Sequence, residues 1–410
     1  MSKNHWLWML LPSNISLGGL SVLIHLHILS PEVKGKVFDV GIATSASNLA
    51  LIPASMIWGY LTDIYHKRKA FIQISNFSAI LGPILLYFSK DVLSITLLYS
   101  LITFFSVARN VNYPLLLMES IKKKLWTKAY TQSLLLSQIG WTLGILPGGF
   151  WSLHFPIKDY YLLLSILSSP SVIIAQISIK EPEVKLERIS AAQRHESLFH
   201  KILSLHLIFL NLPKVKNFFY ILRMFKFNQR IPIIYLSSFL FFLASSLFFT
   251  SYIPFLKDSK VSDSEVFYAF SSMMLLGVVS YPLALKEISN EGEEKTASKA
   301  LIFRLLAVSL GTILSYIKLF VLHISFIILP LMSSAYAYYY TSTSSLLIKS
   351  LHKGKEGELL GVYSALTGLA LFLGAILSGY ISNEFGYFLT FLISSLILSL
   401  SFLTFKKITL

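Results

Sequence analysis

Long apolar runs recur along the chain, and short polar or charged segments separate them. Each run holds about 20 residues, the length at which one α-helix crosses the hydrocarbon core of a bilayer. The first run is too long for a signal-peptide core and has no small-residue cleavage pattern behind it, so we expect a retained span. The pattern predicts an all-α polytopic membrane protein with twelve transmembrane helices. The runs cover residues 6–30, 38–61, 70–89, 92–118, 127–150, 157–179, 231–256, 265–285, 300–317, 322–348, 357–380 and 385–405.

The runs fall into two groups of six, and a basic stretch lies between the groups. Residues 180–230 contain ten Lys or Arg against four Glu, so we expect a solvated linker. Within it, residues 198–212 are apolar but short, and their polar positions share one helical face, which favours an interfacial helix. The predicted organisation is a six-helix bundle at 1–180, a linker at 181–230 and a second six-helix bundle at 231–410.

Composition and charge agree with a membrane protein. Charged residues make up 13% of the chain, against about 25% in ordinary soluble proteins. The net charge of +15 does not predict nucleic-acid binding, because a soluble domain would have to carry the basic patch. Of the 35 Lys and Arg, 26 fall on the side of the spans that holds both termini, 7 on the other side and 2 within spans. Because cytoplasmic loops are rich in cations, we expect a plasma-membrane protein with both termini in the cytoplasm.

Motifs of enzymes are missing from the sequence. The chain has no cysteine, which excludes thiol nucleophiles, disulfides and thiolate metal sites. It also has no Walker, H-E-x-x-H, G-x-S-x-G or dinucleotide-binding motif. We therefore expect no enzymatic activity, no cofactor and no metal site.

Two parts of the chain align with each other at an offset of 230 residues. Such an offset, with six spans before the linker and six after it, predicts a parallel repeat of two pseudo-symmetric six-helix bundles. The aligned pairs are Gly144 with Gly374, Gly148 with Ser378, Gly149 with Gly379, Phe150 with Tyr380, Asp63 with Glu293, and Lys69 with Lys299.

The loop between the second and third spans carries a family motif. It reads GYLTDIYHKRK and matches the pattern G-x-L-(A/S)-D-(R/K)-x-G-(R/K)-(R/K)-K at Gly59, Leu61, Asp63, Lys67, Arg68 and Lys69, but not at Ile64 and His66. With this motif and the repeat, the chain resembles the major facilitator superfamily over essentially its whole length. The resemblance implies a secondary transporter that moves a small organic solute by alternating access. It also implies a monomer in the lipid bilayer, with protons as a candidate coupling ion.

The motif loop is expected to act as a conformational latch. In such a fold Asp63 would lie near the start of the eleventh span, around Gly357, where unpaired backbone N–H groups attract a carboxylate. Arg68 or Lys69 is expected to pair with Glu119 at the end of the fourth span. Gly59 would allow close helix packing. This latch would favour the state that is open to the outside.

The fifth span carries a glycine motif. Its sequence GWTLGILPGG resembles the family signature G-x-x-x-G-P-x-x-G-G at Gly140, Gly144, Gly148 and Gly149, although Ile145 replaces the proline. In the family this signature is associated with antiport and export. The alternative is that the small residues only let two helices pack closely.

Arg109 is the leading candidate for a functional residue inside the membrane, because a buried charge is costly there. It resembles the arginine of the family's fourth-span R-x-x-Q-G pattern, with Asn112 in place of the glutamine. Either it handles substrate or protons, or it is structural. Arg304 lies close to the end of its predicted span, so we expect it to snorkel outward. The other candidates for the substrate or proton path are Asn14, His25, Ser106, Asn112, Gln138, Tyr336 and Tyr340.

Two further functions stay open at this point. A protein of the same fold could flip lipid or lipid-linked substrates, or it could be a membrane sensor that transports nothing. Liposome assays with soluble and lipid substrates would separate the three functions.

Overall fold

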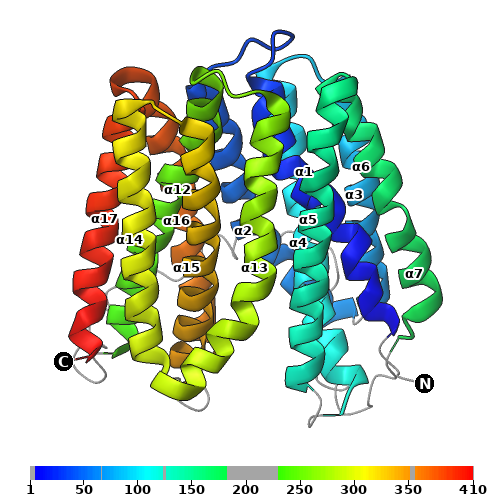
Figure 1. Ribbon diagram of the computed structural model, residues 1–410. Coiled ribbons are helices and arrows are strands. Elements are labelled where there is room, and N and C mark those ends of the chain that lie inside the picture. The colour runs from blue at the N-terminus through cyan, green and yellow to red at the C-terminus, as the bar shows by residue number, and fades with distance from the viewer. Residues whose placement is uncertain (1–4, 66, 123–125, 182–229, 351–355, 410) are drawn as a thin grey trace.

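A computed structural model of the chain describes residues 5–65, 67–122, 126–181, 230–350 and 356–409. The described residues form helices and no strand (Figure 1). Helices are the expected outcome, because a helix satisfies its own backbone hydrogen bonds in a medium without water. The all-α prediction is confirmed. The interfacial helix predicted at 198–212 lies outside the described residues.

The first half of the chain contains six spans, and the last of them is broken. Pro170 cannot donate a backbone hydrogen bond, so the sixth span divides at Ser169 into two short helices. The helices of this half are η1 (His5–Met9), α1 (Leu10–Ile28), α2 (Val37–Tyr65), α3 (Arg68–Phe88), α4 (Val92–Ser120), α5 (Trp126–His154), η3 (Ile157–Asp159), α6 (Tyr160–Ser168) and α7 (Pro170–Ser178).

The second half contains six unbroken spans. Gly292 (φ 85°) separates the second from the third, and Gly386 (φ 84°) separates the last two, at positive φ values that glycine adopts without a steric penalty. The helices of this half are α12 (Arg230–Asp258), α13 (Asp263–Glu291), α14 (Glu293–Ile317), α15 (Val321–Ser350), α16 (Glu356–Phe385) and α17 (Tyr387–Thr409).

Twelve helical spans are present in the described part of the chain, as predicted. Eleven are long and apolar enough to cross a membrane by length and composition alone. The twelfth is α5, whose glutamines and glycines lower its mean hydropathy although it is 29 residues long. Helix α5 packs between α1 and α13, so its polar residues face other helices.

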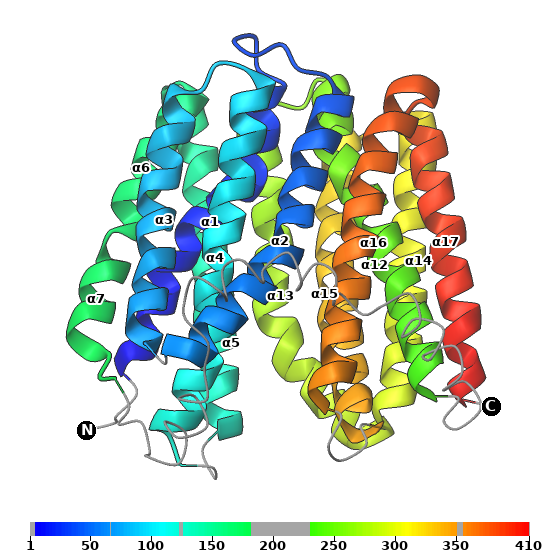
Figure 2. The same cartoon turned by 180° about the vertical axis from the view of Figure 1, so that it is seen from behind.

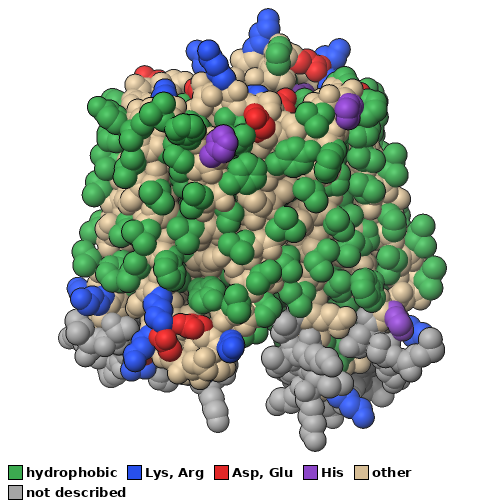
Figure 3. Space-filling model, in the orientation of Figure 1, with side chains coloured by type: hydrophobic (Ala, Val, Ile, Leu, Met, Phe, Trp, Pro, Cys, Tyr) green, Lys and Arg blue, Asp and Glu red, His purple; other side chains and the backbone are tan. Residues whose placement is uncertain are grey.

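The bundle has two ends with different contents. Both chain termini lie at one end, which we call the terminal end; the opposite end, at the α1–α2 loop, is the distal end (Figure 1). On the face in Figure 3, Lys, Arg, Asp and Glu gather at the two ends, and hydrophobic side chains cover the sides. Large apolar residues such as Leu85 and Ile177 are exposed on these sides. This distribution suits a protein surrounded by lipid.

The two halves meet along two helix pairs. Helix α2 packs on α16, seen from behind in Figure 2, and α5 packs on α13 (Figure 1). These pairs are related by the repeat: Gly149 contacts Tyr268, and Gly379 contacts Phe38, with an offset of 230 in both positions. The chain therefore has pseudo-symmetric bundles. The boundaries proposed at 180 and 230 stay a prediction.

Candidate functional site

A layer of polar side chains crosses the bundle at one depth. With 1.5 Å of rise per residue, its members lie about 14–18 Å along their helices from the terminal end. We call these five residues the polar layer. They are Asn14, Arg109, Gln138, Arg304 and Tyr340, which lie 9, 11, 12, 11 and 10 residues from His5, Ser120, Trp126, Glu293 and Ser350, respectively.

Arg109 is buried, with 1% of its surface exposed. Its Nη2 donates to Asn14 Oδ1 at 3.2 Å. Asn14 in turn donates to Leu10 O at 2.6 Å and to Ser137 Oγ at 3.3 Å, so the guanidinium is tied to α1 and α5. Its Nε and Nη1 have no hydrogen-bond partner. Two residues that the sequence marked separately, Asn14 and Arg109, are thus in direct contact.

Arg304 is also buried, and the expectation that it snorkels outward is wrong. Helix α14 begins at Glu293, seven residues before the predicted start of the span at residue 300, so Arg304 lies deep in the bundle. Its Nη1 donates to Met332 O at 2.5 Å and its Nη2 to Ser245 Oγ at 2.8 Å. The rings of Phe241 and Phe249 lie 5.2 and 5.1 Å from its guanidinium carbon. These neighbours replace water around the charge.

Tyrosines from both halves gather beside the polar layer. Tyr336 and Tyr340 of α15 stack at 5.5 Å with an interplanar angle of 8°. Tyr340 interacts electrostatically with Tyr113 and Tyr130 of the first half, and Tyr336 interacts with Arg304 and Tyr281. We call Tyr113, Tyr130, Tyr281, Tyr336 and Tyr340 the tyrosine belt. Tyr340 is 37% exposed.

Gln138 joins the two halves at the polar layer. Its Nε2 donates to Met274 O at 3.2 Å, from α5 to α13. A second bond of this kind joins Asn48 Nδ2 to Leu371 O at 3.3 Å, from α2 to α16. The sequence prediction missed Asn48, although a polar amide within a span was a signal for it.

In the motif loop, the predicted ion pair with Glu119 is present and involves Arg68. Arg68 Nη2 lies 3.0 Å from Glu119 Oε1, and Arg68 Nη1 donates to Thr62 O at 3.0 Å. Lys69 Nζ instead donates to Gln176 O at 2.7 Å, and Lys67 is exposed.

The remaining parts of the predicted latch differ in how far the structure describes them. Gly59 makes no close helix contact in this conformation, because a Cβ added there would meet open space. The side chains of Asp63 and Gly357 lie outside the described residues, so the contact between them stays a prediction.

The second half has its own ion pair at the position that matches the motif loop. Glu293 Oε1 accepts hydrogen bonds from Lys349 Nζ and, at 2.9 Å, from Ser345 Oγ. By the 230-residue offset, Glu293 matches Asp63 and Lys349 matches Glu119. The repeat contained the signal for this pair, which the sequence prediction did not include.

The four glycines of α5 divide between two neighbours. Added Cβ atoms at Gly140 and Gly144 would collide with carbonyl oxygens of α1, within the same half. At Gly148 and Gly149 they would lie 2.6 Å from ring atoms of Phe267 and Tyr268 on α13, in the other half. Ser264 Oγ of α13 also donates to Gly149 O at 2.8 Å. The motif therefore both packs one half and joins the two.

Three predicted path residues lie away from Arg109's direct contacts. His25 Nε2 lies 3.0 Å from Thr44 Oγ1 of α2. Ser106 Oγ donates to Thr103 O of its own helix at 2.8 Å. Asn112 Nδ2 donates to Thr62 Oγ1 at 2.8 Å and links to the Arg68 site. The described residues contain no group of three His, Asp or Glu that could hold a metal ion.

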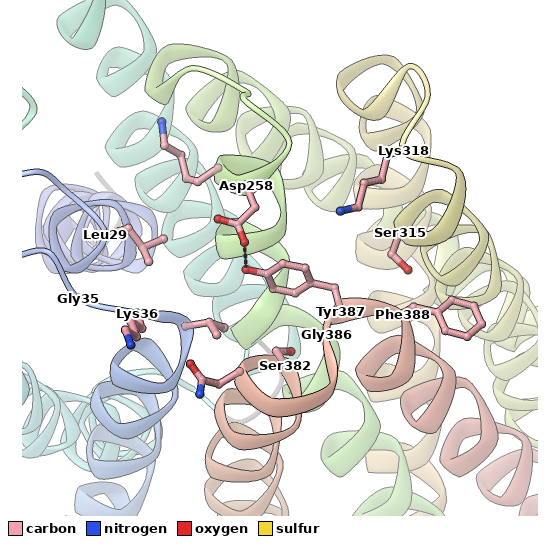
Figure 4. A pocket seen from close by; sticks show the side chains of 13 residues that line it. Leu29, Gly35, Lys36, Asp258, Ser315, Lys318, Ser382, Gly386, Tyr387 and Phe388 are labelled. Carbon is pink, nitrogen blue, oxygen red and sulfur yellow. Dashed lines mark hydrogen bonds between the residues drawn. The ribbon is translucent and has the colours of Figure 1, made fainter.

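A cavity of about 750 Å³ lies at the distal end between the two halves (Figure 4). The α1–α2 loop lines it on one side, and the ends of α12, α14, α16 and α17 line it on the other. Within it, Tyr387 Oη donates to Asp258 Oδ2 at 2.7 Å. None of its lining residues belongs to the polar layer.

Comparison with known proteins gives a consistent result. No curated protein matches the sequence. Among solved structures, the nucleoside transporter NupG has a TM-score of 0.70 at 14% identity, covering 99% of both chains. The xylose transporter XylE from E. coli has a TM-score of 0.73 at 10% identity, covering 99% of this chain and 97% of that one. A mutant of the peptide transporter POT, in complex with sulfate, has a TM-score of 0.72 at 12% identity, covering 97% and 93%.

At these identities the solved structures show the fold alone. The sequence itself matches the family model of the Major Facilitator Superfamily over residues 7–290, which is more than half of the chain. The motif loop, the repeat and the helix pairs between the halves agree with that match. The chain belongs to the Major Facilitator Superfamily of membrane transporters.

Proposed function

We propose that this chain is a secondary transporter that moves a small organic solute by alternating access between its two halves. The observation that carries the proposal is the difference between the two ends of the bundle. Along α2, Gly41 touches Gly379 near the distal end, and an added Cβ at Gly368 would lie 3.3 Å from Ile52 farther along. Gly59, nearer the terminal end, faces open space.

The solute path in this proposal passes through the polar layer. A solute would enter from the terminal end, meet Arg109, Gln138 and Tyr340, and leave when the halves rock and the distal contacts separate. Small residues at those contacts support this, because helices without bulky side chains between them can approach and separate as rigid bodies. The chain has no ATP-binding motif, so a solute or ion gradient supplies the driving force.

The orientation and direction also belong to the proposal. The excess of Lys and Arg at the terminal end supports a cytoplasmic location for both termini in the plasma membrane, which makes the described state open to the inside. The glycine motif of α5 supports export by antiport, with protons as the candidate counter-ion. A monomer is sufficient, since both halves of the path lie in one chain.

A cross-link across the halves tests alternating access. The chain has no cysteine, so Asn48→Cys with Leu371→Cys can be joined by a short bifunctional thiol reagent. Proteoliposomes loaded with an isotope-labelled metabolite mixture are assayed for lost solutes by mass spectrometry. We expect efflux in the uncross-linked protein, arrest after cross-linking and recovery after reduction.

Each single-cysteine variant, treated with the same reagent, is the control. Full efflux from the cross-linked protein would overturn alternating access between these halves. Movement of a labelled lipid instead of a soluble solute would favour a flippase. No flux of any kind would favour a membrane sensor.

A further inference from the structure

The charges inside the bundle are of one sign. Every Asp and Glu in the described helices lies within five residues of a helix end. Arg109 and Arg304, in contrast, lie eleven residues from the nearer ends of α4 and α14. The polar layer therefore holds two cations and no acidic residue.

The two cations differ in how their charge is stabilised. Arg304 has a carbonyl, a hydroxyl and two aromatic rings around it. Arg109 has one hydrogen bond, to a neutral amide, and its Nε and Nη1 donate to nothing. A buried guanidinium with free N–H groups and no counter-charge is unfavourable unless an anion joins it. Arg109 is therefore the place where an anion would gain most.

We propose that the transported solute is a small organic anion whose acidic group binds the free N–H groups of Arg109. This inference rests on the proposed transport function and names its substrate class. Asn14 holds the guanidinium in place, since it is itself bonded to α1 and α5. Arg304 adds positive potential from the second half, so both halves attract the same charge. A carboxylate or a phosphate satisfies this chemistry, because both accept charge-assisted hydrogen bonds from arginine.

The tyrosine belt indicates the rest of the solute. The stacked rings of Tyr336 and Tyr340 offer flat apolar faces next to hydroxyl groups, and Tyr340 is the more exposed of the two. Such a surface suits an aromatic ring or a sugar ring with hydroxyls. The acidic group can come from a soluble metabolite or from a lipid headgroup, and the test has to separate these sources.

Matched probes that differ in the acidic group test the inference by thermal unfolding and titration calorimetry of purified protein. The pairs are benzoate with benzamide and glucose 6-phosphate with glucose. For the lipid source, the protein is compared in nanodiscs of phosphatidylglycerol and phosphatidylcholine. We expect at least one soluble anion to raise the melting temperature while its neutral partner does not.

Variants place the binding at Arg109. In Arg109→Gln we expect the dissociation constant for that anion to rise about 10- to 100-fold, the range for hydrogen bonds to a charged group. Arg109→Lys keeps the charge, so we expect a smaller rise, and it serves if Arg109→Gln does not fold. Lys67→Gln, at an exposed cation, is the control and should bind as the wild type does.

The outcomes for this inference and for the transport function can be told apart. A neutral partner that binds as tightly as its anion, or an unchanged dissociation constant in both Arg109 variants, would overturn the anion inference while leaving transport standing. Stabilisation by phosphatidylglycerol alone would overturn a soluble anion and assign the site to a lipid. Arg109-dependent binding without any flux would overturn the transport function and leave the anion site standing.

Discussion

At the scale of residues, the protein buries three arginines and stabilises each in a different way. Arg68 has a carboxylate partner, Arg304 has a carbonyl, a hydroxyl and aromatic rings, and Arg109 has a single amide. The same side chain therefore holds the fold together at two positions. At the third it is left able to bind a ligand, and the neighbours decide which role applies.

The Arg68 pair predicts a stability effect. Arg68→Ala leaves Glu119 and the carbonyl of Thr62 without their donor. We expect the free energy of unfolding to fall by about 1–3 kcal/mol, below the range for fully buried pairs because Glu119 is partly exposed. Reversible denaturation in mixed micelles measures the change. Lys67→Ala, at the exposed neighbour, is the control, and an equal loss in both variants would contradict the assignment.

At the scale of elements, α5 has two packing faces. Gly140 and Gly144 let it lie against α1 within its own half, and Gly148 and Gly149 let it lie against α13 of the other half. The first contact belongs to a bundle that stays intact. The second has to separate if the distal end opens. One short motif thus serves both stability and conformational change.

The inner face predicts a loss of stability. In Gly144→Ala the new methyl group collides with the Ile15 carbonyl, and we expect a cost of about 1–3 kcal/mol from overpacking. Gly59→Ala has open space around it and should raise stability slightly, because alanine is the better helix former. Melting temperatures of the two variants check this. A drop of the same size in Gly59→Ala would show that the collision is not the cause.

The outer face predicts a shift between states. Gly149→Val clashes with Tyr268 only while the distal end is closed, so we expect the distal-open state to gain population. Ser264→Cys, buried at the same contact, reports this opening by reacting faster with a water-soluble maleimide in the Gly149→Val background. Gly379→Val, the equivalent change on the other helix pair, should act in the same direction. An unchanged labelling rate in both would remove these glycines from the closure.

At the scale of the whole molecule, two pseudo-symmetric halves touch at the distal end and the middle, and the described state is open around Gly59. Both halves place an ion pair at the terminal end, Arg68–Glu119 and Glu293–Lys349. Each pair lies within one half, so these contacts can persist while the halves rock. The contacts between halves are mostly glycine packing and single hydrogen bonds, which a conformational change can break.

Labelling from one side of the membrane tests this arrangement. In sealed vesicles of known orientation, we expect Gly59→Cys to react quickly with an impermeant maleimide applied from the side of the termini. From the other side it should be protected. Ser264→Cys should react slowly from both sides in the absence of solute. Rapid labelling of Ser264→Cys with protection of Gly59→Cys would mean that the populated state is open at the distal end.

Sequence alone determined the helices, the repeat, the family and the importance of Arg109. It could do so because lipid forces each span to satisfy its own backbone hydrogen bonds, and because a charge within an apolar run stands out without knowledge of its neighbours. Only the tertiary structure decided which polar groups meet. Arg304 became a buried residue because α14 starts at Glu293 and because Ser245 and Met332, on two other helices, bond its guanidinium. Asn14 came to hold Arg109, and Gly149 came to face Tyr268, through packing between distant segments that no local pattern encodes.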